Sequence, residues 1–166
     1  ALSSLEKLEE VDLSYNKFGT SSFAAFSSLR SLRMLNLAGS GLSSLPAEVS
    51  CLTGLKMLYL DDNPNITVEQ LEGLSHLTRL EVLALPGCKL RALPAAVTGL
   101  ERLRMLFCHE NKLRTIPSAS SWLGRLSVLS IGLRDMVLCA SELEHAENLV
   151  TLYISRSNDP IELQCS

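Results

Sequence analysis

The residues of this 166-residue chain best suited to chemistry are its histidines, cysteines and acidic side chains. In the tripeptide "CHE", Cys108 precedes His109 and Glu110, which places a nucleophile beside two bases. Neighbouring residues of a strand point to opposite faces, so we expect Cys108 in the core and His109 at the strand end. The other histidines lie far away in the sequence, and no glycine-rich phosphate loop occurs. We therefore predict that the chain is not an enzyme and has no cofactor or small-molecule substrate.

A second possible site is the acidic stretch "LDDNPN", where Asp61 and Asp62 are adjacent. Two carboxylates could contribute to a cation site, or they could be a solvated or turn-capping pair. The second interpretation needs no further ligands, and we predict no metal.

Charge and hydropathy limit the possible partners. Fifteen Lys and Arg residues against eighteen Asp and Glu give a formal charge of −3, without a basic cluster. Nucleic-acid binding is therefore disfavoured. No apolar run is long enough to span a bilayer, so we predict no membrane insertion.

The dominant feature of the sequence is an internal repeat. The pattern Leu-x-x-Leu-x-Leu-x-x-Asn-x-Leu recurs seven times with substitutions at some positions, for example as "LEEVDLSYNKF", "LKMLYLDDNPNI" and "LRMLFCHENKL". The repeats begin at Leu8, Leu32, Leu55, Leu80, Leu103, Leu126 and Leu149. A fixed period over a whole chain is typical of a solenoid.

The pattern resembles the leucine-rich repeat family. Two connecting segments, "LSSLPAEVSCLTGL" and "LRALPAAVTGLERL", are similar to those of the 23-residue class found in intracellular signalling and immune-sensor proteins. Extracellular receptors have closely similar repeats. The resemblance implies a protein-binding function.

The repeat predicts an α/β solenoid with a parallel sheet on its concave face and short helices or 3₁₀ turns on its convex face. The final two leucines of Leu-x-x-Leu-x-Leu point to one face of a strand, and stacked strands join their leucines into one core. Parallel strands require crossovers, which we expect to be right-handed. We predict one domain over residues 1–166, and we expect it to be an excerpt of a longer chain. Its strands are expected near 10–14, 34–38, 57–61, 82–86, 105–109, 128–132 and 151–155.

The connecting segments predict an uneven array. Segments such as "SSFAAFSSL", "TVEQLEGLSHL" and "ASELEHAENL" favour short helices. Pro46, Pro94 and Pro117 favour tighter and more extended returns. Trp122 is interpreted as a packing residue of the convex side, with a surface anchor as the alternative.

The asparagine of the repeat is expected to satisfy backbone groups of adjacent turns. Asn16, Asn63 and Asn111 occupy this position. Arg134 occupies it in the sixth repeat, where a buried charge would be costly, so we expect a distorted unit there.

The five cysteines do not form a disulfide pattern. Cys88 and Cys108 occupy buried positions of their repeats, and no cysteine cluster flanks the array. A reducing compartment is favoured, and we predict a cytoplasmic protein. The sequon "NIT" at Asn65 argues the other way, although one chance match is expected in a chain rich in Ser and Thr.

The outward-facing positions of the strands carry the candidate binding residues. Three of the four methionines fall in one column of these positions, and Tyr59 and Phe107 fall in the next. We predict a protein-binding patch on the concave face, with incidental sheet composition as the alternative. Its members are Met57, Tyr59, Val82, Met105 and Phe107, with Asp61 and His109 in a polar rim that also includes Asp62 and Glu110.

Three functions remain open from the sequence. We predict the first of them, a non-catalytic protein-interaction module that binds a partner or another segment of its own protein through its concave face. The chain could also be the recognition arm of a signalling enzyme or immune sensor, or a structural subunit of a large assembly.

Overall fold

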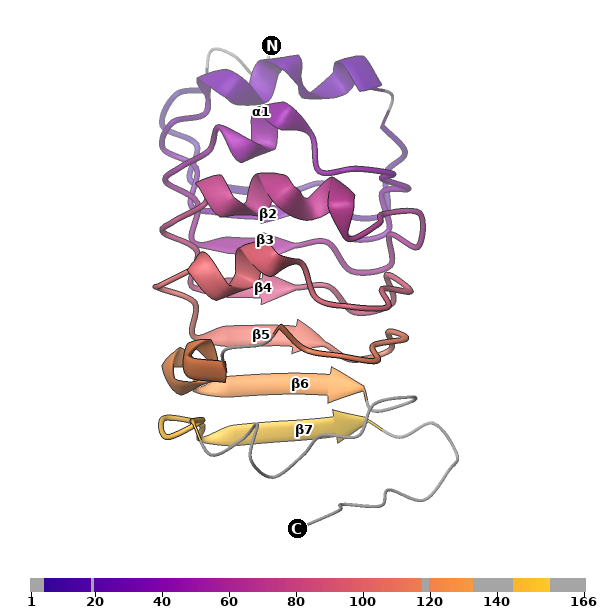
Figure 1. The fold of residues 1–166 in the computed structure, drawn as a ribbon. Coiled ribbons are helices and arrows are strands. Elements are labelled where there is room, and N and C mark those ends of the chain that lie inside the picture. The colour runs from indigo at the N-terminus through magenta and orange to yellow at the C-terminus, as the bar shows by residue number, and fades with distance from the viewer. Residues whose placement is uncertain (1–4, 19, 118–119, 133–144, 156–166) are drawn as a thin grey trace, which may run out of the picture.

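A computed structural model describes residues 5–18, 20–117, 120–132 and 145–155 of the chain. Its central feature is a seven-stranded parallel sheet in which each strand pairs with the next one along the sequence (Figure 1). The strands are β1 (Glu10–Asp12), β2 (Met34–Asn36), β3 (Met57–Tyr59), β4 (Val82–Ala84), β5 (Met105–Cys108), β6 (Val128–Gly132) and β7 (Thr151–Ser155).

The strands begin where the repeat pattern predicted them. Residues at equivalent repeat positions are paired, for example Leu35 with Leu58 and Leu83 with Leu106. The first five strands are shorter than expected, because regular pairing ends after three residues in β1 to β4 and after four in β5. Backbone hydrogen bonds continue beyond these strands, as from the Leu37 amide to the Tyr59 carbonyl at 2.9 Å.

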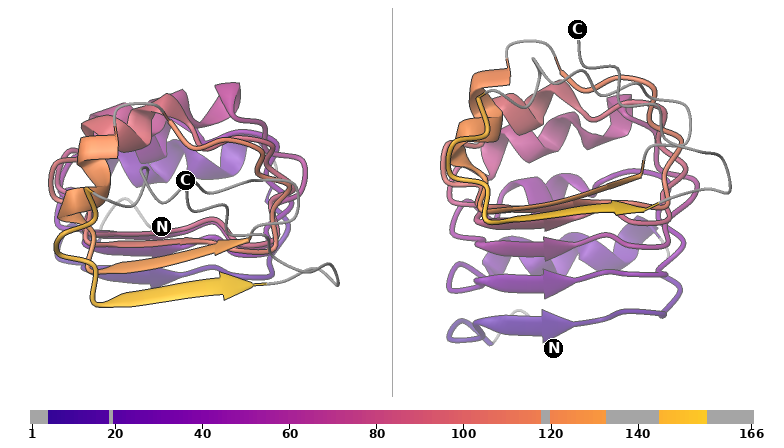
Figure 2. Two further views of the ribbon diagram at one scale, coloured as in Figure 1. Left: turned by 60° about the horizontal axis from the view of Figure 1, so that its bottom comes forward. Right: turned by 90° about the horizontal axis from the view of Figure 1, so that it is seen from below.

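Short helices cover one side of the sheet and leave the other side uncovered by the described residues (Figure 2). The helices are η2 (Thr20–Ser28), α1 (Ala47–Ser50), η3 (Glu69–His76), η4 (Ala95–Gly99) and η5 (Ser120–Arg125). All except α1 are 3₁₀ helices, which confirms the predicted α/β solenoid with short convex-side turns.

The prediction of extended returns at the prolines was wrong in part. The segments after Pro46 and Pro94 are shorter than η2 and η3, but each still forms a helical turn. Both prolines have extended backbone (φ −59° and −62°) immediately before the first helical residue. A ring that fixes φ near −65° suits this position, because the helix needs no amide donor there. The predicted helix in "ASELEHAENL" falls largely outside the described residues.

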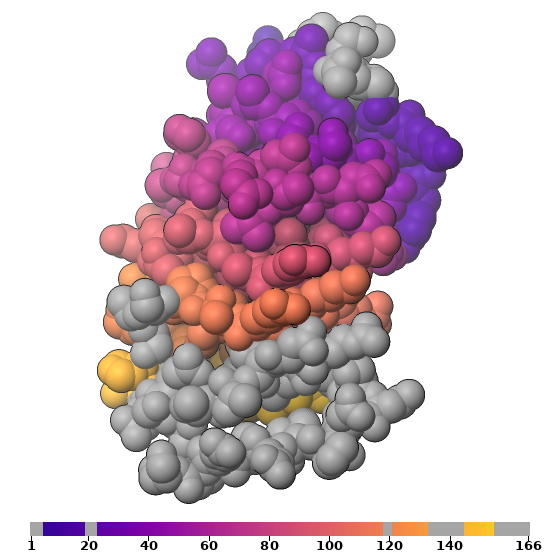
Figure 3. Space-filling view, turned by 45° about the vertical axis from the view of Figure 1, so that its right-hand side comes forward, coloured from indigo at the N-terminus to yellow at the C-terminus, as the bar shows by residue number. Residues whose placement is uncertain are grey.

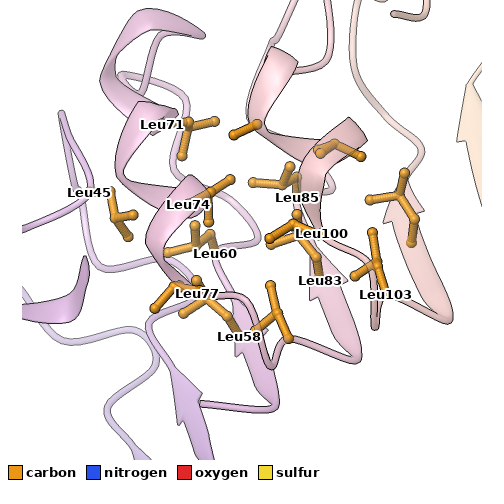
Figure 4. Close-up of a cluster of buried hydrophobic side chains, with 14 of the residues drawn as sticks. Leu45, Leu58, Leu60, Leu71, Leu74, Leu77, Leu83, Leu85, Leu100 and Leu103 are labelled. Carbon is orange, nitrogen blue, oxygen red and sulfur yellow. The ribbon is translucent and has the colours of Figure 1, made fainter. Parts of the chain in front are cut away.

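Leucines from the strands and helices form one continuous core (Figure 4). Leu58, Leu74 and Leu83 are fully shielded from solvent, although they come from a strand, a helix and the next strand. In the space-filling view, successive segments of the chain pack directly against one another from the indigo end to the orange segment (Figure 3). Trp122 belongs to this core and donates a hydrogen bond from Nε1 to the Pro117 carbonyl, which confirms its predicted packing role.

Asn63 and Asn111 connect adjacent turns behind the sheet, as predicted. The prediction was wrong for Asn16, which is exposed and, within the described residues, donates only to the Leu13 and Ser14 carbonyls of its own turn. Asn63 donates from Nδ2 to the carbonyls of Leu37 and Leu60, and its Oδ1 accepts from the Leu42 amide, each at 2.9 Å. Asn111 makes the equivalent bonds two repeats later. Arg134 lies outside the described residues.

The chain turns inward through a left-handed residue at the same place in five repeats. Tyr15, Gly39, Asp62, Gly87 and Glu110 all have positive φ, between 54° and 68°. At two of these places glycine leaves room for a side chain of the preceding repeat, because a Cβ on Gly39 would meet the Tyr15 ring and one on Gly87 would meet the Asp62 carboxylate. Large and small residues therefore alternate along this line of turns.

Candidate protein-binding surface

The open face, defined as the side of the sheet opposite the helices, consists of alternate strand residues. In β2, β3 and β5 the central leucine is buried and its two neighbours are partly exposed. Met57, Val82 and Met105 are paired in register, as are Tyr59, Ala84 and Phe107. These six residues form two parallel rows across β3, β4 and β5.

The structure brings the predicted apolar residues together. Met57, Tyr59, Val82, Met105 and Phe107 are each partly buried, whereas Ala84 between the two aromatic residues is only 3% exposed. The Tyr59 hydroxyl lies 3.9 Å from the Met57 sulfur, so the two rows also contact each other. Whether a partner binds these residues stays a prediction.

A hollow of about 410 Å³ lies at the end of these strands. It is lined by Tyr15, Tyr59, Asp61, Asp62, Ala84, Pro86, Phe107, His109 and Glu110. The fourth repeat contributes only Ala84 and Pro86, while the third and fifth repeats contribute aromatic and charged side chains. The hollow therefore exists because small residues lie between two rows of large ones.

Asp61 is the most unusual group in the hollow. Its Oδ1 atom is shielded from solvent and has no hydrogen-bond partner among the described residues. Burial raises the pKa of Asp61, and the neighbouring charge of Asp62 raises it further, while His109 acts in the opposite direction. Removing a carboxylate from water disfavours its charged form, and the opposing effect of His109 does not offset this cost.

Three other polar side chains of the hollow, those of Tyr15, Asp62 and His109, have partners. The Tyr15 hydroxyl donates to Asp62 Oδ2 at 3.2 Å, and this carboxylate raises the pKa of Tyr15. His109 Nδ1 lies 2.9 Å from the Ser130 hydroxyl on the neighbouring strand. These contacts fix the sides of the hollow.

The sequence analysis missed Tyr15 and the role of small residues in the fourth repeat. Tyr15 is 72% exposed, but its ring crosses Gly39 to reach Asp62, two repeats away. The available signal was the alternation of large and small residues at the turn position, together with Ala84 between Tyr59 and Phe107.

The nucleophilic and metal-ligating residues are not gathered into a site in the described part of the chain. Cys108 is buried, as predicted, and burial raises its pKa to about 12. Burial likewise raises the pKa of Cys88 to about 11. Over the described ranges, no three His, Cys, Asp or Glu side chains are placed to hold a metal ion, and no helix could span a membrane.

Comparisons with known proteins agree with the repeat architecture. The family model described as "Leucine rich repeat" matches residues 1–42. Receptor-like protein EIX1 of Solanum lycopersicum is 41% identical over 80 residues, which is 47% of this chain and 8% of that protein. The chain thus spans a small part of this curated relative.

Solved structures extend the likeness to nearly the whole chain. A leucine-rich repeat protein of Leptospira interrogans has a TM-score of 0.75 and 25% identity, covering 93% of this chain and 44% of that one. The internalin InlF of Listeria monocytogenes has a TM-score of 0.71 and 20% identity, covering 92% and 43% of the two chains. Internalin C2 of the same organism has a TM-score of 0.63 and 18% identity, covering 93% and 74%.

Proposed function

From the premise that this chain is a leucine-rich repeat protein, we propose that it is a non-catalytic protein-binding module that holds a partner on its open face. One observation carries the proposal: two rows of side chains lie in register across β3, β4 and β5. The rows are Met57, Val82 and Met105, and beside them Tyr59, Ala84 and Phe107. A rigid sheet presents these side chains together, so the surface is preorganised. The module would therefore lose little conformational freedom when a partner binds.

The composition of this surface favours protein over other ligands. Aromatic residues and methionine are enriched at the centres of protein interfaces, and a polar rim commonly surrounds them. Here Asp61 and His109 lie at the strand ends beside the apolar rows. The formal charge of −3 disfavours nucleic acid.

A second candidate function is recognition within a larger receptor or signalling protein. The similarity to a receptor-like protein supports it, although the alignment covers 8% of that protein. Both candidates use the open face, and they differ in what is joined to the chain.

The cytoplasmic location and the absence of catalysis remain predictions. Accessible Cys51 and buried Cys88 are free thiols, which agrees with a reducing compartment.

The test is capture of partners from cell extract by the wild type and by a Tyr59→Ser/Phe107→Ser double variant, compared by quantitative mass spectrometry. The control is Glu72→Ser/His76→Ser, which changes two exposed residues of η3 on the helix side. We expect the first variant to lose partners that the control retains. Both should unfold cooperatively near the wild-type temperature, because neither change removes a residue of the leucine core.

Equal capture by all three proteins would contradict the proposal. If only the first variant unfolds early, single Tyr59→Phe and Phe107→Leu variants replace it, since they retain most of the buried apolar area. If these milder variants captured every partner as well as the wild type does, this result would likewise count against the proposal.

A further inference from the structure

We propose that the hollow over Ala84 receives an arginine side chain of the bound protein. The inference rests on the proposed function, because it names the group that the partner inserts into the open face. It is carried by three independent features of the hollow: its shape, its charge and the unpartnered Asp61.

The shape of the hollow suits a flat group. Tyr59 and Phe107 lie in register on β3 and β5, with buried Ala84 on β4 between them. Strands separated by one neighbour are about 9.6 Å apart, since adjacent strands are about 4.8 Å apart. A planar group in van der Waals contact with a ring on each side needs about 7–8 Å. The strand spacing is thus wide enough for a guanidinium, and the hollow that Tyr59, Ala84 and Phe107 line provides the space for it.

The charge of the hollow is negative. Asp61, Asp62 and Glu110 line it, His109 is the only basic residue there, and no lysine or arginine is among its lining residues. Aromatic faces attract cations, so the rings and the carboxylates favour the same kind of ligand. An anionic side chain would instead meet three carboxylates in a partly dry site.

The carboxylate of Asp61 favours a cationic ligand. Its Oδ1 has no partner and is shielded from water, whereas Asp62 already accepts a hydrogen bond from Tyr15. His109 offsets only part of the cost of this shielded charged acceptor, so the remainder destabilises the unbound protein. A cationic donor brought by the partner would offset the rest of this penalty, and the charge would be fully compensated only in the complex.

Arginine fits better than lysine for two physical reasons. Its guanidinium is flat, stacks on aromatic rings and offers several donors in a fixed plane, while an ammonium group is compact and strongly hydrated. The rings of Tyr59 and Phe107 can stack only on the flat group. Lysine would still gain from the carboxylates, so we expect it to bind more weakly.

The test starts with a random-peptide display selection against the wild-type chain. Peptides that also fail to bind the Tyr59→Ser/Phe107→Ser variant occupy the open face and are taken forward. Each is synthesised with its arginines replaced singly by citrulline, which keeps the shape of arginine without its charge, or by lysine. One citrulline change should weaken binding about ten- to hundredfold, the range expected for a charge-assisted contact.

Variants of the chain locate the effect. Asp61→Asn/Glu110→Gln removes two carboxylates of the hollow, and Asp12→Asn/Glu10→Gln removes two exposed carboxylates from β1 on the same face. Both double variants make the net charge less negative by the same amount. We expect only the first to abolish the preference for arginine over citrulline.

The outcomes separate this inference from the proposed function. Peptides that need Tyr59 and Phe107 but bind equally well with citrulline or lysine would overturn the inference and support the protein-binding role. The same holds if both charge doubles weaken binding equally, because the attraction would then be a general effect of net charge. Selection of no peptide dependent on the open face would overturn both.

Discussion

Replacing Asn63 by alanine is predicted to destabilise the chain strongly. The side chain is 0% exposed and bridges two repeats through both ends of its amide. Nδ2 donates to the carbonyls of Leu37, Leu60 and Asp61, and Oδ1 accepts from the Leu42 amide. Alanine removes all four bonds and supplies no donor or acceptor.

The size of the effect follows from which groups keep another partner. The Asp61 carbonyl still accepts from the Gly39 amide at 2.8 Å, and the Leu60 carbonyl still accepts from the thiol of the following repeat. The Leu37 carbonyl and the Leu42 amide have no other partner in the described structure. A buried unsatisfied group costs about 1–3 kcal/mol, so two groups give about 2–6 kcal/mol.

Urea denaturation of matched variants measures this loss. Asn111→Ala should have a similar effect, because Asn111 is 5% exposed and makes the equivalent bonds. Asn16→Ala is the control, since Asn16 occupies the same repeat position but is exposed and bonds only to the nearby Leu13 and Ser14 carbonyls. An Asn63→Ala loss no larger than that of Asn16→Ala would refute the reasoning.

Three further predictions concern the core, the hollow and the thiols. Leu58→Ala should lower the free energy of unfolding by about 2–5 kcal/mol in urea denaturation, and Leu152→Ala should lower it less, because Leu58 is 0% and Leu152 39% exposed. Asp61→Asn should raise the melting temperature at neutral pH. Burial and an adjacent carboxylate raise the pKa of Asp61 in the folded state, so the native protein binds the proton more tightly and its stability falls as pH rises through that range. Melting curves from neutral pH down to about pH 3.5, below the ordinary Asp pKa, should therefore show the advantage of Asn disappearing. In the native protein at mildly alkaline pH, iodoacetamide should modify exposed Cys51 and spare buried Cys88, whose pKa is about 11, as peptide mapping would reveal. Equal modification of both would contradict the structure.

The sheet could be predicted from the sequence because it depends on a strict two-residue alternation. Leucine at every second strand position fixes which side is buried, and this assigned Leu58 and Leu83 to the core and Met57 and Tyr59 to the open face. The helix type could not be predicted in the same way. A connection of one or two turns is too short for helical periodicity to distinguish an α-helix from a 3₁₀ helix or an extended return.

The hollow was harder to predict because it depends on differences between repeats. The alignment of repeats emphasises what they share, whereas the hollow arises where Ala84 and Pro86 replace the larger side chains of the repeats on each side. Tyr15 was missed for a related reason. Its contact with Asp62 passes over Gly39 and joins repeats that are not adjacent, which a comparison of neighbouring repeats does not reveal.

Three consecutive residues at the end of β3 show how the fold separates structure from recognition. Asn63 is buried and satisfies the backbone of two repeats, while Asp62 makes the left-handed turn and holds Tyr15. Asp61 faces the hollow with an oxygen that the folded chain leaves unpartnered. Replacing Asn63 should therefore damage the fold, whereas replacing Asp61 by its amide should stabilise it. A residue that is predicted to lower stability while facing a cavity fits a binding role, because residues that perform a function commonly cost stability.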